Sequence, residues 1–164
     1  HQLTYDQRME RVRFAQLWLA KRNPHNVWFV DESAIYIEGS STRAWTRCGQ
    51  PTPDIRSHDP NRYIRMFAGI SWDGKTQLVL HRKKFNGERY AQALKQFLVP
   101  CATKFHQSTW SLYQDNDPSH VGKKAVENYR DVIPNNIQAP TWSPDFNPIE
   151  LIWHVIKSAV GLVH

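Results

Sequence analysis

Apolar and polar positions alternate along this chain in blocks that predict helices and strands in turn. Residues 4–23 read as an amphipathic helix, because Thr4 and Gln7 have the spacing of a capping box and apolar residues recur among charged ones. Residues 27–37 are apolar and aromatic on either side of a polar triplet. This pattern is typical of a central strand that either bends at the triplet or continues to pair with a neighbouring strand beyond it. Residues 39–60 are polar and rich in Ser, Thr, Pro and Arg, and we expect a loop or a protruding arm there.

The middle of the chain has the pattern of a hairpin followed by a helix. Strand-like runs at 62–72 and 76–82 flank the dipeptide Asp-Gly at 73–74, which is a strong signal for two antiparallel strands. A helix is then expected over 86–99, where Pro100 interrupts the pattern and a short kinked continuation follows.

The last third of the chain alternates between strand and helix patterns. We predict strands at 110–115 and 136–139 and helices at 118–132 and 148–160. Such alternation favours parallel strands joined by right-handed crossovers. The elements together predict a single α/β domain over 1–164, with a mixed five-stranded sheet flanked by helices. In sheets of this kind, ligands bind outside the carboxyl ends of the strands.

Length and composition narrow the class of protein. A chain of 164 residues can bury about 70% of the surface that it exposes when unfolded, so it needs no cross-links to fold. Cys48 and Cys101 fit no metal-binding spacing, and we interpret them as reduced thiols of an intracellular protein. No run of apolar residues is long enough for a membrane span, and no secretion signal opens the chain. Because the chain starts and stops abruptly, we expect it to be a piece of a longer protein.

The charge of the chain points to a polyanionic partner. Lysine and arginine number 21 against 15 acidic residues, which gives a net charge of +6. Such a balance favours nucleic acid electrostatically. Composition alone leaves an ordinary basic protein as an equal alternative.

Three acidic residues stand where predicted elements reach an edge. Asp31 and Asp115 each end a strand-like run, and Glu150 lies just inside the last helix. Singly, each has a plain structural explanation, since an aspartate caps bends and a glutamate at the third helical position caps its own helix. Together they match a divalent-metal phosphoryl-transfer site, because Mg²⁺ prefers oxygen ligands and keeps positions open for water and phosphates. Two such ions, about 4 Å apart, stabilise both the attacking and the leaving oxygen.

Longer motifs surround these acids. Residues 113–120 read YQDNDPSH, residues 142–153 read WSPDFNPIELIW, and residues 29–33 read FVDES. These motifs resemble the signature of the mariner superfamily of cut-and-paste DNA transposases. From Asp115 to Glu150 is 150 minus 115, or 35 positions, which leaves 34 intervening residues. This spacing is similar to that of the branch of the family whose third ligand is glutamate.

The resemblance implies a fold, an activity and a site. The fold would be ribonuclease-H-like, and Asp31, Asp115 and Glu150 would be the catalytic metal ligands. They would hold two Mg²⁺ ions, with Mn²⁺ able to substitute. The implied reaction cuts phosphodiester bonds at transposon ends and joins the freed 3′-hydroxyl to target DNA. The partners would be transposon-end and target DNA, with a homodimer formed on DNA in the nucleus. The helix-turn-helix modules with which the family reads transposon ends are absent from this stretch of sequence.

The filled site has a different charge from the empty one. Three carboxylates contribute about −3 and two ions +4, so the filled site carries about +1 and accepts a phosphodiester that the empty site would repel. This hypothesis makes metal occupancy the switch for substrate binding.

Polar residues beside the three acids have separate interpretations. Glu32 follows Asp31 in a strand, so its side chain should point to the opposite face and should not share the same metal. Asp117 is expected to cap the helix that follows it, and Asp145 is expected in a turn. His120 either orients water or phosphate from just behind the metal ligands, or simply packs near the start of a helix.

Basic and aromatic residues supply a candidate DNA surface. Lysine and arginine neutralise phosphates, and an exposed tryptophan can stack on an unpaired base. The candidate residues are Arg43, Trp45, Arg47, Arg82, Lys83, Lys84, Lys123 and Lys124. A solvated basic face is the alternative for the lysine pairs. The other tryptophans are interpreted as core or sheet-packing residues.

Two alternatives to a transposase stay open on the sequence. One is a ribonuclease-H-like nuclease that cuts with the same three acids without transposition. The other is a domesticated, transposase-derived protein that binds nucleic acid or partner proteins without cutting. The second is weakened because all three acids are present.

Overall fold

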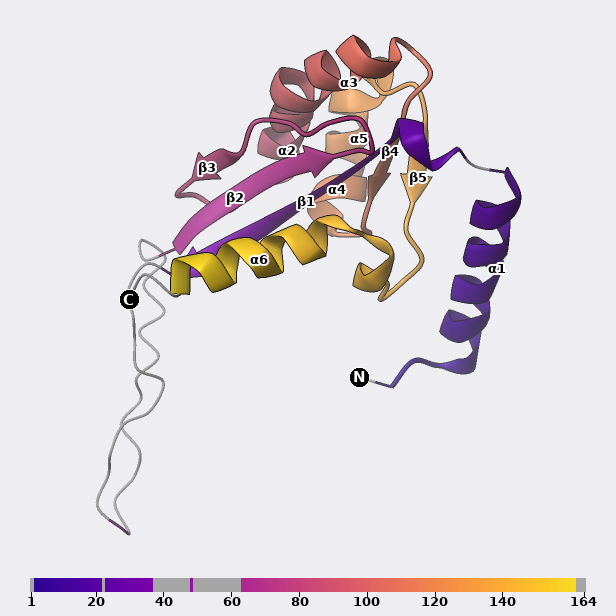
Figure 1. The fold of residues 1–164 in the computed structure, drawn as a ribbon, viewed down its shortest axis with the longest axis horizontal. Helices are drawn as coiled ribbons and strands as arrows, with labels where there is room; N and C mark the ends of the chain where they lie inside the picture. The colour runs from indigo at the N-terminus through magenta and orange to yellow at the C-terminus, as the bar shows by residue number, and fades with distance from the viewer. Residues whose placement is uncertain (1, 22, 37–47, 49–62, 162–164) are drawn as a thin grey trace.

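The computed structural model describes residues 2–21, 23–36, 48 and 63–161 (Figure 1). The expected arm at 39–60, with Arg43, Trp45 and Arg47, lies outside these residues apart from Cys48. The helices are α1 (Tyr5–Lys21), α2 (Gly87–Ala93), α3 (Val99–His106), α4 (Pro118–Val121), α5 (Lys123–Tyr129) and α6 (Ile149–Gly161). The strands are β1 (Val27–Tyr36), β2 (Tyr63–Ile70), β3 (Val79–His81), β4 (Ser111–Gln114) and β5 (Asn136–Gln138).

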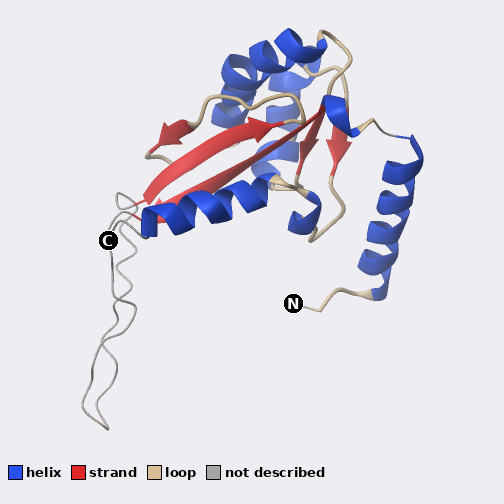
Figure 2. Ribbon diagram, in the orientation of Figure 1, coloured by secondary structure: helices blue, strands red, loops and turns tan. Residues whose placement is uncertain are grey.

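The five strands form one mixed sheet, as the sequence predicted, in the order β3-β2-β1-β4-β5 (Figure 2). β2 pairs antiparallel with both β1 and β3, which confirms the hairpin. β4 pairs parallel with β1 and with β5. The central strand β1 is much longer than β4, which pairs only with its first three residues, Val27 to Phe29. The rest of β1 therefore has an edge that β4 does not cover.

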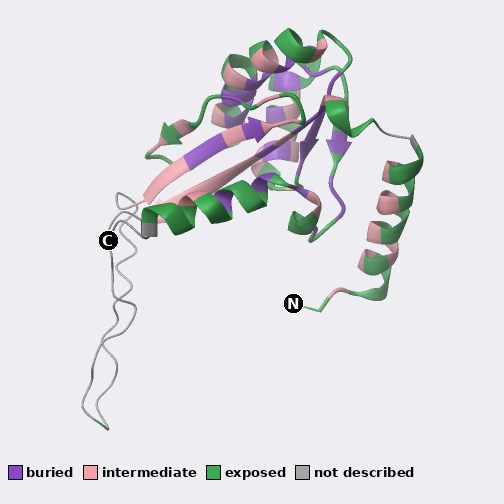
Figure 3. Cartoon of the chain, in the orientation of Figure 1, coloured by how far each residue is buried: buried purple, intermediate pink, exposed green. Residues whose placement is uncertain are grey.

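The two faces of the sheet are buried by different helices. Alternate residues of β1, Trp28 and Val30, pack into a core with α2, α3 and α5. The intervening residues face the other side, where Phe29 packs near α1 and Ile35 packs near α6. Figure 3 shows the buried positions concentrated in the sheet and on the inner sides of the helices, whereas α1 has only half-buried and exposed positions.

One expected helix was wrong, and the interruption expected in another has a particular form. The helix predicted over 118–132 is two helices and a 3₁₀ turn, because Gly122 is extended (φ −60°, ψ 142°). A Cβ at Gly122 would lie 2.6 Å from the carbonyl oxygen of Pro118, so only glycine fits this break. The interruption expected at Pro100 takes the form of a π-helical turn, Leu94–Leu98, just before it.

The tryptophans divide between core and surface. Trp28, Trp110 and Trp153 are buried, as predicted. Trp72 and Trp142 are 75% and 60% exposed, contrary to their expected role in packing. Both lie in turns, where the backbone rather than an element face sets the direction of the side chain.

Helix α1 is joined to the turn that precedes α6. The guanidinium of Arg11 donates to both carboxylate oxygens of Asp145 (2.9 and 2.5 Å) and to Ser143 Oγ (2.7 Å), and it lies over the ring of Phe146. It also donates to the carbonyl oxygen of Trp142, whose φ of 56° is in the left-handed region. Arg11 thus supports a turn that is costly for a bulky residue.

Replacement of Arg11 tests this role. Arg11→Ala should lower the free energy of unfolding by about 1–2 kcal/mol. The substitution removes a bidentate ion pair, and it removes the hydrogen bonds that hold the turn at Trp142 in its costly conformation. Urea denaturation measures the loss. Arg13→Ala, on an exposed position of the same helix, is the control and should change stability by less than about 0.5 kcal/mol. Equal effects of the two substitutions would contradict the assignment.

Candidate active site

The register of the two parallel strands places Asp31 beside Asp115. Phe29 pairs with Tyr113, the last pair between the two strands, and Asp31 and Asp115 each stand two residues further along the chain from this pair. Neighbouring strands lie about 4.8 Å apart, and residues two apart share a face. Asp31 lies within β1, and Asp115 directly follows the last residue of β4. Both sequence-predicted aspartates therefore lie just beyond the end of this pairing, where they line the same cleft.

The start of α6 is fixed to the same part of β1. The buried amide of Asn147 donates to the carbonyl oxygen of Val30 (3.1 Å) and accepts from the backbone N–H of Ile149 (3.3 Å). One side chain thus caps α6 and ties it to the residue before Asp31. Glu150 follows in the first turn of α6 and is exposed.

Asp31 is held by an indole and surrounded by negative charge. Trp153 Nε1 donates to Asp31 Oδ2 over 3.0 Å. Burial raises the pKa of Asp31 to about 7, with further contributions from the charges of Glu150, Glu32 and Asp115. Of these three charges, that of Glu150 raises the pKa of Asp31 most. The third predicted acid is therefore close enough to act on the first electrostatically.

Asp115 has one carboxylate oxygen fixed by two donors. His120 Nδ1 lies 2.5 Å from Asp115 Oδ1, and the backbone N–H of Asp117 donates to the same oxygen over 3.0 Å. Burial raises the pKa of Asp115, but these two hydrogen bonds and the charge of His120 outweigh it, and the pKa is lowered overall. Asp117 also caps α4 by accepting from the backbone N–H of Ser119, as predicted.

His120 is buried between two carboxylates. Its Nε2 lies 2.8 Å from Glu32 Oε2, and its ring stacks on Tyr90 with centroids 4.0 Å apart. Burial lowers the pKa of His120, but the hydrogen bonds and charges of Asp115 and Glu32 raise it to about 10. The ring is therefore an imidazolium that donates from both nitrogens.

A buried polar chain supports the histidine from behind. Tyr90 donates to Gln114 Oε1 (2.5 Å), and Gln114 Nε2 donates to the hydroxyl of Tyr129 (2.8 Å). That hydroxyl donates to the carbonyl oxygen of His120 (3.1 Å). Because these side chains are almost completely buried, the network holds His120 in one orientation.

A cleft of about 920 Å³ lies at the uncovered edge of β1. Asp31, Glu32, Asp115, Asp117 and His120 lie on its walls. Three cations join them from separate elements: Arg65 of β2, Lys84 after β3, and Lys157 of α6.

The predicted DNA contacts are only partly brought to this cleft. Lys84 lines it, whereas Arg82, Lys83, Lys123 and Lys124 lie outside it. Arg65 and Lys157 were missed by the sequence reasoning. A signal existed for Lys157, which stands seven positions, or two helical turns, after Glu150.

The donor set fits a divalent cation without forming a closed site. Asp31 and Asp115 each have one oxygen oriented by hydrogen bonds. Burial raises the pKa of Asp31 most, and the repulsion by neighbouring carboxylates that adds to it is of the kind that a cation relieves. Within the described residues, however, no three His, Cys, Asp or Glu side chains are grouped closely enough to hold one ion. Glu150 does not line the cleft.

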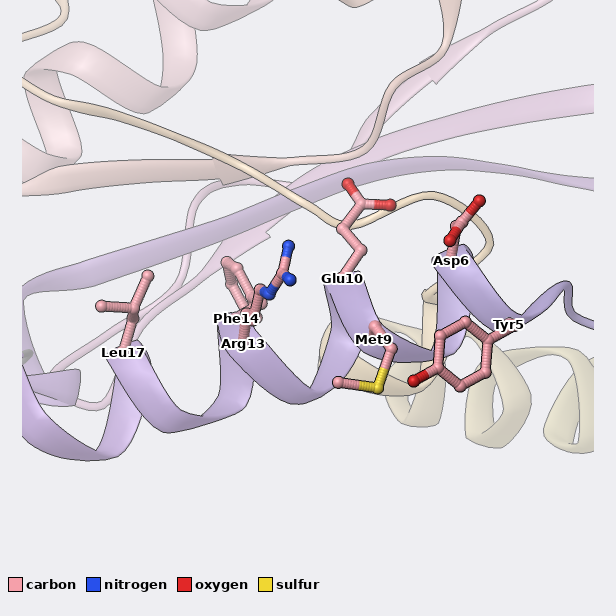
Figure 4. Close-up of a pocket in the computed structure, with 7 residues that line it drawn as sticks. All are labelled: Tyr5, Asp6, Met9, Glu10, Arg13, Phe14 and Leu17. Atoms are coloured by element: carbon pink, nitrogen blue, oxygen red, sulfur yellow. The ribbon is translucent and has the colours of Figure 1, made fainter.

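A second hollow runs along α1, away from these residues (Figure 4). It is lined by side chains of this helix, among them Tyr5, Met9 and Leu17. Because the carboxylates of the cleft are not among its lining residues, the hollow has no place in their chemistry.

None of the helices in the described parts of the chain is long and apolar enough to cross a bilayer.

Solved structures share this architecture. The catalytic domain of Mos1 mariner transposase matches with a TM-score of 0.71 at 15% identity, over 98% of this chain and 74% of that one. The Mos1 mariner paired end complex with Mn matches with a TM-score of 0.75 at 20% identity, over 98% and 51% of the two chains. The sheet order and the flanking helices thus define a ribonuclease-H-like domain.

Sequence comparison gives the family. The family of DDE superfamily endonucleases matches residues 26–162, and the chain belongs to this family. The Tcb2 transposase of Caenorhabditis briggsae is 27% identical over 171 residues, covering 94% of this chain and 60% of that protein. The Tc3 transposase of Caenorhabditis elegans is 23% identical over 161 residues, covering 96% and 49%. The chain therefore spans about half to three fifths of these two relatives.

The raised pKa of Asp31 makes the stability of the metal-free protein depend on pH. A carboxyl with a higher pKa in the folded state stabilises the protein at low pH, and this contribution is lost as pH rises towards the folded pKa of about 7. Asp31→Asn keeps the acceptor for Trp153 but removes the charge. Relative to wild type, it should gain about 3 kcal/mol of stability between about pH 5 and pH 8.

Urea denaturation in chelator at both pH values measures this gain. Glu127→Gln, on an exposed position of α5, should show no such change. A gain that does not vary with pH would contradict the raised pKa of Asp31.

Proposed function

We propose that this chain is the catalytic domain of a DNA transposase that cuts phosphodiester bonds at transposon ends and joins the 3′-hydroxyl to target DNA. The observation that supports it most is that Asp31 and Asp115 line one cleft just beyond the end of the parallel β1–β4 pairing. The chain that forms this cleft belongs to the family of DDE superfamily endonucleases. The match to Tcb2 and Tc3 transposases favours transposition over simple cleavage.

Asp31, Asp115 and Glu150 are the proposed metal ligands, with glutamate as the third. Mos1 structures that match this fold were solved with Mn and with Mg, which supports these metals for the present chain. Two divalent ions, when bound, supply activation of the attacking hydroxyl and stabilisation of the leaving oxygen. Glu150 completes the set by a change of side-chain position at the exposed first turn of α6.

The chain's own residues prepare the cleft for a phosphodiester. Trp153 and His120 orient the two aspartates, so that less freedom is lost when a cation binds. Arg65, Lys84 and Lys157 bring positive charge to the rim, where it neutralises phosphates on either side of the bond that is cut. Arg82, Lys83, Lys123 and Lys124, which lie outside the cleft, are proposed to contact DNA phosphates beyond it.

Assembly and location follow from the same proposal. Two of the Mos1 structures that share this fold are a paired end complex and a strand transfer complex. We propose that this chain likewise acts as a homodimer on two transposon ends, in the nucleus where the DNA lies. Recognition of the ends would depend on parts of the protein other than this domain.

Substitution of the acids tests the activity. Asp31→Asn, Asp115→Asn and Glu150→Gln should each lower Mg²⁺-dependent cleavage by about 1,000-fold or more, because each removes a metal ligand. Gel assays measure cleavage, and wild-type protein given a pre-cut end with a free 3′-hydroxyl should form joined product. Cleavage retained in any of the three variants would remove that residue from the site. Cleavage without joining would instead indicate a nuclease.

The cationic rim predicts a salt dependence. Log affinity for DNA should fall with log salt at a slope of about −0.9 for each neutralised phosphate, and Lys84→Ala should reduce this slope by about 1. Lys104→Ala, on an exposed position of α3, is the control and should leave the slope unchanged. Filter binding at several salt concentrations measures it. An unchanged slope for Lys84→Ala would remove this residue from the DNA surface.

A further inference from the structure

Glu32 lies on the face of the sheet opposite to Asp31. The side chain of Asp31 meets Trp153 of α6, whereas Glu32 meets His120 of α4. The alternation expected for neighbours in a strand is therefore observed. Glu32 nevertheless reaches the cleft, because β4 does not pair with β1 beyond Phe29.

Glu32 is a largely buried carboxylate, and burial of one of its oxygens is not compensated by a hydrogen bond among the described residues. Its side chain is 16% exposed, and its Oε1 has no hydrogen-bond partner among the described residues. A buried carboxylate oxygen without a partner is unfavourable. Its other oxygen contacts the Nε2 of His120. The contact with His120 is thus the role that the structure gives to this glutamate.

His120 transmits that contact to Asp115. His120 is 3% exposed, and its ring is fixed in its plane by stacking on Tyr90, so its two nitrogens have defined directions. Nε2 points to Glu32 and Nδ1 to Asp115. A ring anchored at one nitrogen presents the other at a constant position.

The carboxylate of Asp115 is held by one oxygen only. Both hydrogen bonds that the structure describes for it, from His120 and from the backbone of Asp117, go to Oδ1. The second oxygen, Oδ2, is left for a ligand in the cleft. The side chain of Asp115 is 55% exposed, so without these donors it would rotate freely.

We propose that Glu32 and His120 are a positioning pair, in which Glu32 anchors the His120 ring so that the ring fixes Asp115 with one oxygen turned to the cation. This rests on the proposed function, in which Asp115 is a metal ligand. The pair touches neither substrate nor metal. It acts on the cation through Asp115 alone.

Two substitutions of His120 separate positioning from charge. The amide nitrogen of asparagine takes the place of Nδ1, and that of glutamine takes the place of Nε2. His120→Asn therefore keeps the donor to Asp115, and His120→Gln keeps only the donor to Glu32. Both remove the same positive charge. If charge alone mattered, both would bind a cation more tightly, because a nearby positive charge is lost.

The test measures Mn²⁺ affinity by electron paramagnetic resonance and the Mg²⁺ dependence of cleavage. Positioning predicts that His120→Gln, which loses the donor to Asp115, weakens Mn²⁺ binding by about 10-fold to 100-fold. His120→Asn keeps this donor but loses the anchor to Glu32, so it should weaken Mn²⁺ binding by a smaller factor, below about 10-fold. Glu32→Ala removes the acceptor for Nε2, which a glutamine would still supply, and should weaken Mn²⁺ binding more in the wild-type background than in the His120→Asn background, where the anchor is no longer used. Glu127→Gln, an exposed acid on α5, is the control for loss of one negative charge.

The outcomes distinguish this inference from the proposed function. Mn²⁺ binding by His120→Gln as tight as wild type, with binding lost in Asp115→Asn, overturns the positioning pair and leaves the function intact. Unchanged binding in Asp115→Asn contradicts the proposed function itself. If the His120 variants do not fold, a crystal of the wild-type protein with Mn²⁺ decides the matter. The ion on Oδ2 with His120 still on Oδ1 supports the pair, and an ion that displaces His120 from Oδ1 overturns it.

Discussion

The parallel pairing of β1 with β4 is the constraint on which the rest of the site depends. It involves only three residues of β1, Val27 to Phe29, yet its register sets Asp31 and Asp115 at equal distances along the chain from its last pair. A shift by one residue on either strand would turn one aspartate to the opposite side of the sheet. The short length of β4 is equally important, because the uncovered edge of β1 is where both faces of the sheet open into one cleft. The sheet that forms the core therefore also creates the site, because the β1–β4 pairing stops before the end of β1.

Several carboxylates line the cleft, and their negative charges are balanced to different degrees by the groups beside them. Asp115 has an imidazolium beside it and a lowered pKa, whereas Asp31 has an indole N–H and a pKa raised to about 7. Two carboxylates of the same cleft thus differ in their affinity for protons. A divalent cation between them would remove the repulsion that Asp31 experiences, and the basic rim then faces a site that no longer repels phosphate. The electrostatics of the metal-free cleft are consistent with a family of metal-dependent endonucleases.

The helices contribute by fixing this edge from two sides. On one face, Asn147 ties the start of α6 to Val30, and Arg11 of α1 supports the turn that leads there. On the other face, the buried chain through Tyr90, Gln114 and Tyr129 holds the backbone of His120. The helix break at Gly122 belongs to the same arrangement, because it ends α4 one turn after its Asp117 cap and lets α5 turn back onto α2. Conformational freedom near the aspartates is therefore removed mainly by residues that perform no chemistry.

Local sequence determined the elements, the two aspartates at strand ends, the hairpin and the glutamate of the last helix, because hydrophobic period, turn residues and caps act over a few neighbouring positions. It also determined that Asp31 and Glu32 point to opposite faces. Only the tertiary structure decided what each meets there. Glu32 and His120 are 88 positions apart, and Asp31 and Trp153 are 122 apart. Such contacts depend on strand order, register and helix docking, which arise from the packing of the whole core and leave no local pattern. For the same reason Arg65 gave no signal in the sequence, although folding brings it to the cleft.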